Sequence, residues 1–410
     1  MKSVCMLVQN SYELDMRVRR KAEALIAAGY SVDVLSVHRA PFRKTYTLNG
    51  VNIHNVSLAK RRGSLARYAF EYLAFVSWTC FHLTSRMPSR RYALVDVNTL
   101  PDFLVFSGIF ARWMGAKLLL DMHEITPEFY MSKYGIEEDS RWIRLLKYLE
   151  KISFDFADHV VTINEPIRDL FVSRGLPGPK TTVIMNSADE ANFGLESKAT
   201  AAERAGLPKF VMMYHGTLTK IYGLDIAIEA FSFVHEEMPG AEMWILGDGT
   251  EQIALEKLAR DRGLSSKVRL LGFVPPRDIP SWLSKCDVGI LPIRRDKFLE
   301  FASPNKLSEY IVKSRPVIIS RLKAIRYYFS ENALAYFEPN DPVDLSRQML
   351  RIYRDKDLRA RLAATAEAEY APLRWEVMKQ RYLALVEKMI GPAQEIPEAS
   401  LVAQVTTCQR

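Results

Sequence analysis

Residues 210–234 read FVMMYHGTLTKIYGLDIAIEAFSFV, and this stretch decides the fold. The apolar run at 210–214 predicts a strand, Gly216 predicts a turn, and the amphipathic run at 224–234 predicts a helix. The alternation continues downstream, with strands expected at 242–246, 268–271, 288–291 and 316–320 and helices at 251–261, 278–285 and 304–312. Strands that alternate with helices pair in parallel through right-handed crossovers. We therefore expect a doubly wound α/β domain in this half of the chain.

The first half of the chain shows the same alternation. Its expected strands are short and bounded by polar residues, and they lie at 3–8, 31–36, 94–98, 117–121, 159–163 and 182–185. A helix is expected at 16–28, and the aperiodic run at 187–208 predicts a linker. The expected divisions of the chain are domains at 1–190 and 191–373, a helix at 374–390 and a disordered tail at 391–410.

Composition excludes several classes of protein. The chain has 410 residues, of which 48% are hydrophobic and 25% are charged, which is unlike a collagen or a disordered chain. Its four cysteines lie far apart and have no metal-binding spacing, which favours a reducing compartment. No signal sequence or membrane-spanning run is evident. We therefore expect a cytoplasmic protein that holds no metal ion and no other cofactor.

The net charge of +8 is concentrated near the start of the chain, because residues 1–100 hold 15 Lys and Arg against 6 Asp and Glu. An aromatic run at 68–83 lies there between two groups of cations, which are Lys60, Arg61 and Arg62 before it and Arg86, Arg90 and Arg91 after it. Such a run is typical either of a helix lying in an anionic membrane surface or of a core helix with cations at its ends. Both interpretations stay open, and residues 60–91 are the candidate membrane contact.

The run EFASPNKLSE, which ends at Glu309, predicts an anion-binding helix start. Ser303 suits an N-cap and Pro304 suits the first helical position, so free N–H groups are expected near Asn305 and Lys306, where a diphosphate would bind. Glu309 lies one turn, about 5.4 Å, further along, where its carboxylate could accept from both hydroxyls of a ribose. The alternative is that Ser-Pro only begins a helix and that Glu309 is a surface acid.

Glycines follow two of the predicted strands, at Gly216 in HGTL and at Gly247 in GDG. Glycine permits the tight turn and close backbone approach that a nucleotide phosphate requires, although many such turns use glycine for geometry alone. The chain has no G-x-G-x-x-G motif and no G-x-x-x-x-G-K-[ST] motif. Hydride transfer and P-loop hydrolysis are therefore disfavoured.

Polar side chains follow several strands of the first half. His123 and Glu124 follow the strand at 117–121. A histidine there could hydrogen-bond a sugar hydroxyl or a phosphate oxygen, although a single histidine is often structural. The other candidates follow other strands and are Asn10, Tyr12, Asp15 and Asn98. Since ligands bind at the carboxyl ends of parallel strands, we expect these side chains to line one cleft.

Six segments of the second half occur in a recognisable order, namely HGTL at 215–218, YGLDIAIEAF at 222–231, ILGDG at 245–249, VRLLGFVP at 268–275, CDVGILP at 286–292 and SPNKLSEY at 303–310. Together with two doubly wound domains, they resemble family 4 of the glycosyltransferases, which has the GT-B fold. The resemblance implies two Rossmann-like domains that face each other across a cleft. It also implies an acceptor in the first domain, a nucleotide-sugar donor in the second, and a C-terminal helix that crosses back to the first.

The resemblance also assigns roles to individual residues. It implies that Glu309 binds the ribose, that Gly272 and Phe273 hold the base, that Gly216 lies beside the phosphates, and that His123 lies near the transferred sugar. The full set expected at the donor site is Gly216, Thr217, Lys220, Gly247, Gly272, Phe273, Ser303, Pro304, Asn305, Lys306 and Glu309.

The chain departs from the family pattern at one acidic residue of the second domain and at one turn of the first domain. The first Glu of the family's paired-Glu motif falls at Phe301, so that the neighbouring Glu300 would have to substitute for it. The glycine-rich turn after the first strand is replaced by NSY at 10–12.

The cations of the family pattern are also missing. The Arg and Lys that neutralise the diphosphate fall at Thr217 and Tyr222, so Lys220 or Lys306 would replace one of them.

The resemblance implies a hexosyltransferase that retains the anomeric configuration and needs no metal ion. His123, Lys220 and Glu300 are the expected catalytic residues, and a UDP-sugar rather than a GDP-sugar is the expected donor. The expected acceptor is a lipid-linked sugar or polysaccharide precursor, met at the inner face of the plasma membrane by a peripherally bound protein.

Two other functions fit the same fold. A nucleotide-sugar epimerase would release product without any acceptor. An inactive GT-B partner that only binds nucleotide sugar, or that scaffolds a membrane complex, would account for the missing Arg, Lys and first Glu. Nucleic acid is not an expected partner, because the basic region holds no recognised binding module.

Overall fold

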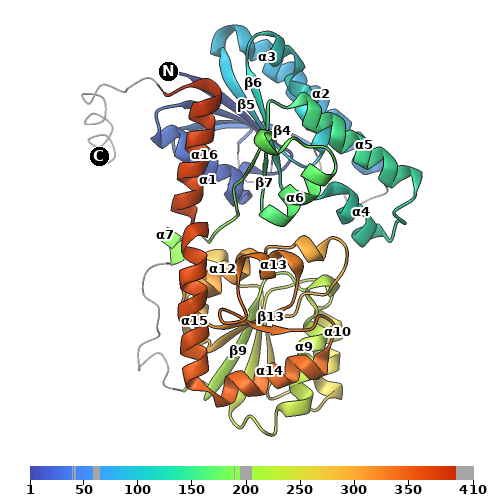
Figure 1. Ribbon diagram of the computed structural model, residues 1–410, viewed down its shortest axis with the longest axis vertical. Helices are drawn as coiled ribbons and strands as arrows, with labels where there is room; N and C mark the ends of the chain where they lie inside the picture. Colours follow the sequence, from blue (N-terminus) through green and yellow to red (C-terminus); the bar gives the residue numbers. More distant parts are fainter. Residues whose placement is uncertain (39, 41–42, 59–64, 189, 194–205, 394–410) are drawn as a thin grey trace, which may run out of the picture. The chain divides into compact units, whose positions relative to one another are not determined.

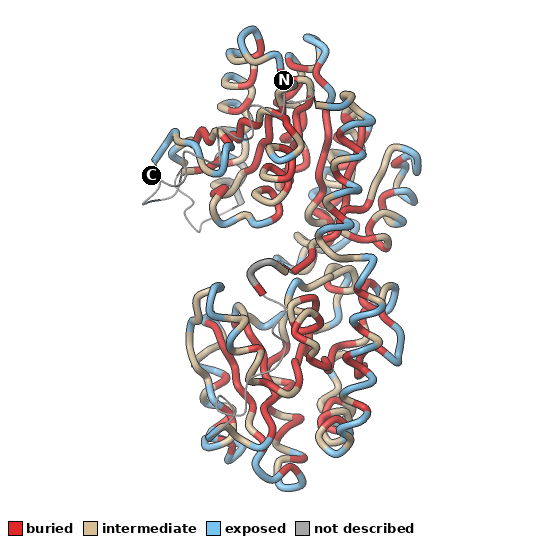
Figure 2. The backbone as a smooth tube through the Cα atoms, turned by 90° about the vertical axis from the view of Figure 1, so that its left-hand side faces the viewer, coloured by how far each residue is buried: buried red, intermediate tan, exposed pale blue. Residues whose placement is uncertain are grey.

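Short, largely buried strands build two parallel-sheet units. The computed structural model describes residues 1–38, 40, 43–58, 65–188, 190–193 and 206–393. One unit comprises Met1–Ile184 and the chain from Met378 onward, and the other comprises Met185–Val377. Buried residues follow the strands of each sheet, and exposed residues lie on the helices and loops around them (Figure 2). The predicted class, two doubly wound α/β domains, is confirmed.

The first unit holds an eight-stranded sheet in the order β3-β4-β2-β1-β5-β6-β7-β8. Its strands are β1 (Ser3–Val8), β2 (Ser31–Val37), β3 (Thr45–Leu48), β4 (Val51–Val56), β5 (Tyr92–Asn98), β6 (Lys117–Met122), β7 (His159–Thr162) and β8 (Thr181–Val183). Neighbouring strands are parallel except for β3 and β4, which pair in antiparallel fashion. This sheet brings the carboxyl ends of β1, β5 and β6, the strands that precede the candidate polar residues, to one edge.

The hairpin of β3 and β4 is missing from the sequence-based predictions. Asn49 and Gly50 connect its strands, with φ angles of 50° and 80°. Positive φ at both turn residues is typical of two-residue hairpins, and Asn-Gly is a preferred pair for them. The Asn-Gly pair could therefore have predicted this hairpin from the sequence.

Helices surround this sheet (Figure 1). They are α1 (Met16–Ala27), α2 (Leu65–Arg90), α3 (Ile109–Trp113), α4 (Thr126–Tyr134), α5 (Arg141–Phe156), α6 (Glu165–Ser173) and, from Met378 onward, α16 (Trp375–Ile390), with 3-10 turns η1 (Tyr12–Leu14), η2 (Asp102–Gly108) and η3 (Gly178–Lys180). Helices α1 and α16 are neighbours, because Lys21 Nζ lies 5.0 Å from the centre of the Tyr382 ring. From residue 394 onward, the predicted tail lies outside the described residues.

Helix α2 contains the aromatic run that had two interpretations. Phe75, Leu83 and Met87 are buried, so one side of the helix belongs to the core of the unit. Phe70 and Phe81 are 64% and 69% exposed. The helix therefore combines a core side with an apolar outer side. None of the helices that the structure describes is both long and apolar enough to cross a membrane.

The second unit holds a six-stranded parallel sheet in the order β11-β10-β9-β12-β13-β14. Its strands are β9 (Phe210–His215), β10 (Ala241–Leu246), β11 (Val268–Gly272), β12 (Val288–Leu291), β13 (Val317–Ser320) and β14 (Ala335–Phe337). The strand order reverses between β9 and β12, and ligands bind at such switch points in open α/β sheets.

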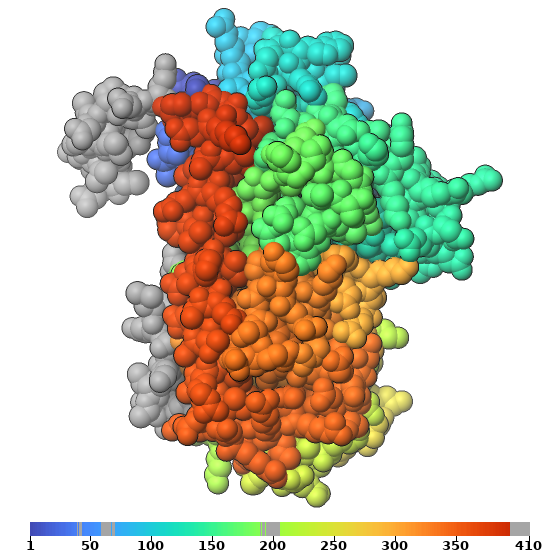
Figure 3. Space-filling view, in the orientation of Figure 1, coloured from blue at the N-terminus to red at the C-terminus, as the bar shows by residue number. Residues whose placement is uncertain are grey.

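The helices of the second unit follow the predicted alternation. They are α7 (Glu190–Phe193), α9 (Leu224–Val234), α10 (Gln252–Asp261), α11 (Ile279–Lys285), α12 (Asn305–Val312), α13 (Lys323–Tyr328), α14 (Pro342–Arg354) and α15 (Lys356–Tyr370), with 3-10 turns η4 (Lys220–Tyr222), η5 (Pro276–Asp278), η6 (Leu299–Phe301) and η7 (Ala371–Leu373). Figure 3 shows α14 and α15 covering one face of this unit. The candidate residues lie in the loops after β9, β10 and β11 and on α12.

Candidate functional site

Backbone hydrogen bonds join the loops that follow β9, β10 and β11. Gly216 N donates to Leu246 O at 2.9 Å, and Gly247 N donates to Gly272 O at 2.7 Å. Backbone hydrogen bonds therefore join, into one continuous layer, the ends of the three strands at which the predicted glycines Gly216, Gly247 and Gly272 lie. The layer forms at the carboxyl edge of the sheet, where the sequence predicted phosphate contacts.

The first two glycines of this layer are required by their backbone conformations, and Gly247 is also required by close packing against backbone. Gly216 has a φ of +123°, and a Cβ at this position would lie 2.2 Å from Lys306 Cε. Gly247 has a φ of +132°, and a Cβ there would lie 1.9 Å from the Gly216 oxygen. Both conformations suit glycine alone. Gly272 also has a positive φ, 72°, but has open space around its missing Cβ.

Helix α12 begins one residue later than predicted. Pro304 occupies the N-cap position with φ −71° and ψ 129°, which is extended backbone, and no side chain caps the helix. The prediction that Ser303 is the N-cap and Pro304 the first helical residue is therefore wrong. The proline ring fixes only φ, and here ψ keeps the residue outside the helix. The first helical N–H groups are those of Asn305 and Lys306, as expected for an anion-binding helix start.

Lys306 extends from this helix start across Gly216. Its Nζ lies 4.2 Å from the centre of the Tyr222 ring and 5.5 Å from that of Tyr214. Burial lowers the pKa of Lys306 to about 8, although Glu309 opposes the change. The ammonium group therefore keeps most of its charge at neutral pH and is poorly hydrated, which favours contact with an anion.

Glu309 lies one turn along α12 from the helix start and faces His215 at the end of β9. The Glu309 Oε2 and His215 Nε2 atoms are 3.3 Å apart. Burial, followed by the charge of Lys306, lowers the pKa of His215 to about 3, so the imidazole is neutral. Its buried Nε2 has no hydrogen-bond partner with good geometry in the described part of the chain. Glu309 therefore lies beside a neutral imidazole.

Glu300 is already engaged by its own surroundings. Arg295 Nε lies 2.6 Å from Glu300 Oε1, and the Lys323 backbone N–H donates to Glu300 Oε2 at 2.8 Å. Glu300 thus binds the first residue of α13. Next to it, Lys323 Nζ lies 5.1 Å from the centre of the Phe301 ring. The structure places an aromatic ring and a cation where the family pattern has its first Glu.

Three other predicted donor residues lie at the surface of the same loops. Thr217 and Lys220 are exposed in the loop that follows β9. Phe273 follows Gly272 and is 67% exposed. These side chains are accessible to a ligand.

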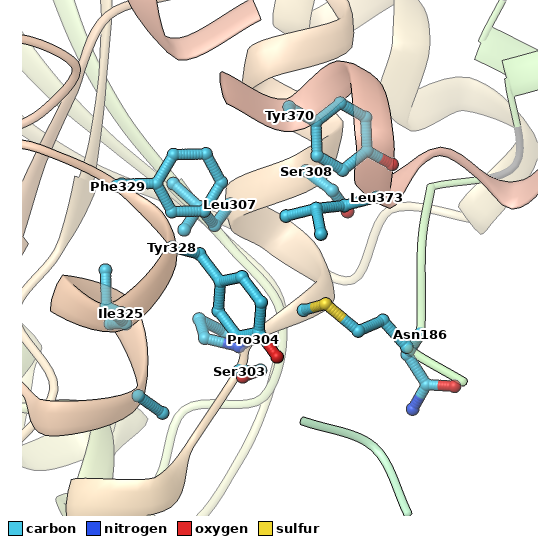
Figure 4. Close-up of a pocket in the computed structure, with 12 residues that line it drawn as sticks. Asn186, Ser303, Pro304, Leu307, Ser308, Ile325, Tyr328, Phe329, Tyr370 and Leu373 are labelled. Carbon is cyan, nitrogen blue, oxygen red and sulfur yellow. The ribbon is translucent and has the colours of Figure 1, made fainter. Parts of the chain in front are cut away.

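A small cavity of about 30 Å³ lies on the opposite side of α12. Leu307 and Ser308 face it, together with Tyr328 and Tyr370 (Figure 4). Lys306 and Glu309 lie on the other face of the helix, because residues three apart in an α-helix share a face. The cavity holds about one water molecule, and Ser303 and Pro304, two of the predicted donor residues, also line it.

In the first unit, His123 follows β6 and lies beside a carboxylate. Its backbone N–H donates to Thr99 Oγ1 at 3.1 Å, and its Nε2 lies 3.5 Å from Asp121 Oδ2. The neighbouring Glu124 has no hydrogen-bond or ion-pair partner among the described residues, and burial raises its pKa to about 7. Sequence and structure therefore agree that a histidine and a carboxyl group stand at the end of this strand.

The remaining predicted residues of the first unit have structural contacts. Asp15 caps α1 by accepting from Val18 N at 3.2 Å, and Asn10 Nδ2 lies 3.4 Å from Asp15 Oδ2. Tyr12 and Asn98 are fully buried. Asn98 does not reach the surface. It belongs instead to a group of charged residues whose pairing was not predicted from the sequence.

This group, the buried ionic cluster, comprises Arg17, Lys21, Asp96, Asn98, Asp121 and Tyr382. Lys21 Nζ lies 2.7 Å from Asp121 Oδ2 and 2.9 Å from Asp96 Oδ2. Arg17 binds Asp121 with two nitrogens, at 3.0 Å and 2.7 Å. The sequence could have indicated this cluster, because Asp96 and Asp121 interrupt otherwise apolar strands. Buried charges are almost always paired, so each acid predicts a cation nearby.

No group of three or more His, Cys, Asp or Glu side chains within the described residues could hold a metal ion.

Comparisons with known proteins agree with this architecture. Residues 14–187 match the family described as "Glycosyl transferase 4-like domain", and residues 209–355 match "Glycosyl transferases group 1". Sucrose-phosphate synthase from Thermosynechococcus elongatus has a TM-score of 0.77 at 17% identity, with 95% of this chain and 99% of that one covered. HepE of Anabaena, in complex with UDP-glucose, has a TM-score of 0.68 at 16% identity, with 95% and 100% covered.

Curated relatives carry related names. "Probable glycosyltransferase WbjE" of Pseudomonas aeruginosa is 24% identical over 65% of this chain and 66% of its own length. The lipopolysaccharide core biosynthesis glycosyltransferase LpsE of Rhizobium meliloti is 29% identical over 42% of this chain and 49% of its own length. The alignments thus span between half and two thirds of these relatives.

Two doubly wound domains, together with the likeness to these solved structures, define a protein of the GT-B fold. The two family matches lie in these two domains, one in each, and together cover most of the chain. The chain belongs to the family 4-like glycosyltransferases.

Proposed function

We propose that this chain transfers a hexose from a nucleoside-diphosphate sugar to an acceptor hydroxyl. The observation that carries the proposal is the position of Lys306 over Gly216 at the start of α12, with Glu309 one turn further along. HepE binds UDP-glucose in its solved structure, which supports a UDP-sugar as the donor. The transfer retains the anomeric configuration and requires no metal ion.

The donor binds with its diphosphate at the N-terminus of α12. Helix N–H groups and the Lys306 ammonium stabilise the negative charge that grows on the leaving nucleoside diphosphate. Lys220, exposed in the loop after β9, supplies a second cation. Glu309 accepts hydrogen bonds from the ribose hydroxyls, and the exposed Phe273 ring contacts the base.

The acceptor hydroxyl attacks the anomeric carbon on the face from which the diphosphate departs. A bond forms from the acceptor oxygen to this carbon as the bond to the phosphate oxygen breaks, and the departing phosphate takes the hydroxyl proton. Configuration is therefore retained. His123 orients the reacting groups, and Glu124 accepts a hydrogen bond from the acceptor.

The acceptor is a lipid-linked sugar or polysaccharide precursor at the cytoplasmic face of the membrane. This part of the proposal is supported by the outer side of α2, where Phe70, Leu73 and Phe81 are exposed. Exposed apolar residues flanked by cations favour binding to anionic lipid. Of the cations that follow this run, Arg86 contacts His54 at 2.9 Å and Arg90 contacts Asp33 at 3.1 Å. The cations before the helix, Lys60, Arg61 and Arg62, lie outside the described residues.

A thermal-shift screen against nucleotide sugars tests the donor assignment, because a ligand that binds the folded state raises its stability by mass action. We expect UDP-sugars to raise Tm and GDP-sugars to raise it less. Binding to vesicles of anionic lipid, compared with vesicles of neutral lipid, tests the membrane contact. Substituting Phe70 and Phe81 with Ser should abolish vesicle binding, and equal binding to both kinds of vesicle would contradict the assignment.

One observation favours a second candidate function, an inactive nucleotide-sugar-binding partner. Glu300, the substitute for the family's first Glu, already binds Arg295 and the backbone of Lys323. An inactive partner would bind UDP-sugar and release no UDP with any acceptor lipid. An active transferase releases UDP in proportion to acceptor.

A further inference from the structure

The buried ionic cluster contains two cations and two carboxylates that satisfy one another away from water. Lys21 is fully buried, and its three N–H groups have acceptors on Asp121, Asp96 and Asn98 at 2.7 to 3.1 Å. A buried charge is tolerated only when it is paired and hydrogen-bonded in this way. The arrangement is therefore held rigidly in place.

Asp121 is the member of the cluster that faces the candidate site. Burial opposes its ionisation, but Arg17, Lys21 and His123 together hold the pKa of Asp121 well below its usual range. Arg17 Nη2 contacts Oδ1 of this carboxylate at 2.7 Å, whereas Arg17 Nε and Lys21 Nζ contact Oδ2 at 3.0 Å and 2.7 Å. His123 Nε2 lies 3.5 Å from Oδ2, near enough for the charge of the carboxylate to act on the ring.

The Nε2 atom of His123 is buried, and no hydrogen-bond partner with good geometry is present for it among the residues that the structure describes. The adjacent carboxylate favours a proton on Nε2, since an anion stabilises a facing N–H group. Nδ1 is then unprotonated and is free to accept a hydrogen bond from a hydroxyl.

The cluster also reaches helix α16. Tyr382 is fully buried, and its hydroxyl donates to Asp96 Oδ2 at 2.6 Å. Because Lys21 bridges Asp96 and Asp121, we expect loss of the Tyr382 hydroxyl to alter the contact between Lys21 and Asp121. Helix α16 is thereby linked to the His123 ring through three side chains.

We propose that Asp121 is a positioning residue that holds His123 in the Nε2–H tautomer, and that Arg17, Lys21 and Tyr382 keep Asp121 in place for this purpose. The relevance of this tautomer to transfer rests on the proposed function, because it presents an unprotonated Nδ1 to an acceptor hydroxyl. The tautomer itself is a property of the free chain.

The test is nitrogen NMR of the full chain labelled in its histidines, at roughly pH 8.5, two units above the usual imidazole pKa. The signal of His123 is identified by its loss in the His123→Gln variant. We expect the Nε2–H form in the wild-type chain. We expect a shift toward the Nδ1–H form in Asp121→Asn, because an amide N–H can donate to Nε2, and a mixture of both forms in Tyr382→Phe.

Tyr30→Phe is the matched control, because the Tyr30 hydroxyl donates to Gly391 O at 3.0 Å, just beyond α16, and does not touch the cluster. This variant should keep the wild-type ring signal. A cooperative unfolding transition of the first unit in every variant, followed by calorimetry, would show that each one is folded. An Nδ1–H ring in the wild-type chain, or the same ring signal in wild type, Asp121→Asn and Tyr382→Phe, would overturn the proposal. Failure of UDP binding in the wild-type chain would instead count against the proposed function.

Discussion

Lys306 crosses Gly216 so closely that a Cβ at residue 216 would lie 2.2 Å from the Lys306 Cε atom. This contact joins the loop after β9 to the start of α12, so the glycine turn and the helix N-terminus form one site. The cation is held there by the rings of Tyr214 and Tyr222. Predictions about donor binding follow from this contact.

Gly216→Ala should weaken UDP binding by at least about tenfold, or 1.4 kcal/mol. The added methyl group displaces Lys306 and also meets a φ of +123°, which side chains rarely adopt. Gly263→Ala is the control, because Gly263 has a φ of +71° but nothing within 4 Å of the new Cβ. Isothermal titration calorimetry of both variants compares a strained alanine beside Lys306 with a strained alanine that meets no neighbour. Equal affinity in the two variants would contradict the role given to Lys306.

UDP affinity should fall as the pH rises through the pKa of Lys306, which burial lowers to about 8. The ammonium group is charged below this pH and attracts the diphosphate, and it is neutral above it. We expect a loss of roughly tenfold between about pH 7 and pH 9 in a calorimetric series. Lys306→Met should bind weakly at both pH values, so that most of the pH dependence is lost. The same pH dependence in wild type and variant would exclude Lys306 as its source.

Glu309→Ala should remove discrimination between ribose and deoxyribose. In the wild-type chain the carboxylate accepts from the ribose hydroxyls, and we expect UDP to bind about tenfold more tightly than 2′-deoxy-UDP, since hydrogen bonds to charged groups contribute about 1.5 kcal/mol or more. Competition binding of the two nucleotides measures the ratio. A damaged site would weaken both nucleotides equally and keep the ratio, which distinguishes disruption from loss of the specific contact.

Asp102→Asn should stabilise the chain at alkaline pH. Burial raises the pKa of Asp102 to about 7, so the folded state holds a proton that the unfolded state releases. The resulting stabilisation is complete below the ordinary carboxyl pKa of about 3.9 and is lost as the pH rises through about 7. Asn does not ionise, and its oxygen still accepts from the Thr126 hydroxyl, as Asp102 does at 2.8 Å.

Calorimetric unfolding should therefore show a Tm increase of about 2 °C or more for Asp102→Asn at about pH 8, and a clearly smaller increase at about pH 5, where only part of the stabilisation has been lost. An equal shift at both pH values would mean that the effect does not arise from ionisation of this carboxyl group.

Local sequence predicted those parts of the fold that depend on local patterns. The strands from β9 to β13 begin and end within one residue of their predicted limits, because each is an apolar run closed by a turn. The start of α12 was misplaced by one residue because proline suits both the N-cap and the first helical position, and only ψ distinguishes them. The β3–β4 hairpin was missed although its Asn49-Gly50 turn is a strong signal.

The contacts of the candidate site depend instead on pairing between distant residues. The buried ionic cluster joins Lys21 to Asp96 and Asp121, and Asp96 to Tyr382, across separations of 75, 100 and 286 residues. Glu300 similarly binds the backbone of Lys323, 23 residues away. Helical and strand periods carry no information about such partners, so a sequence alone identifies the charged residues but not their pairing.

A crystal structure of the full chain with UDP tests the central claim most directly. We predict that the diphosphate lies at the N–H groups of Asn305 and Lys306, with an oxygen within hydrogen-bonding distance of Lys306 Nζ, and that the ribose hydroxyls bind Glu309. Nucleotide bound elsewhere, for example beside Leu307 and Ser308 on the opposite face of α12, would contradict the account, as would an empty site at saturating UDP.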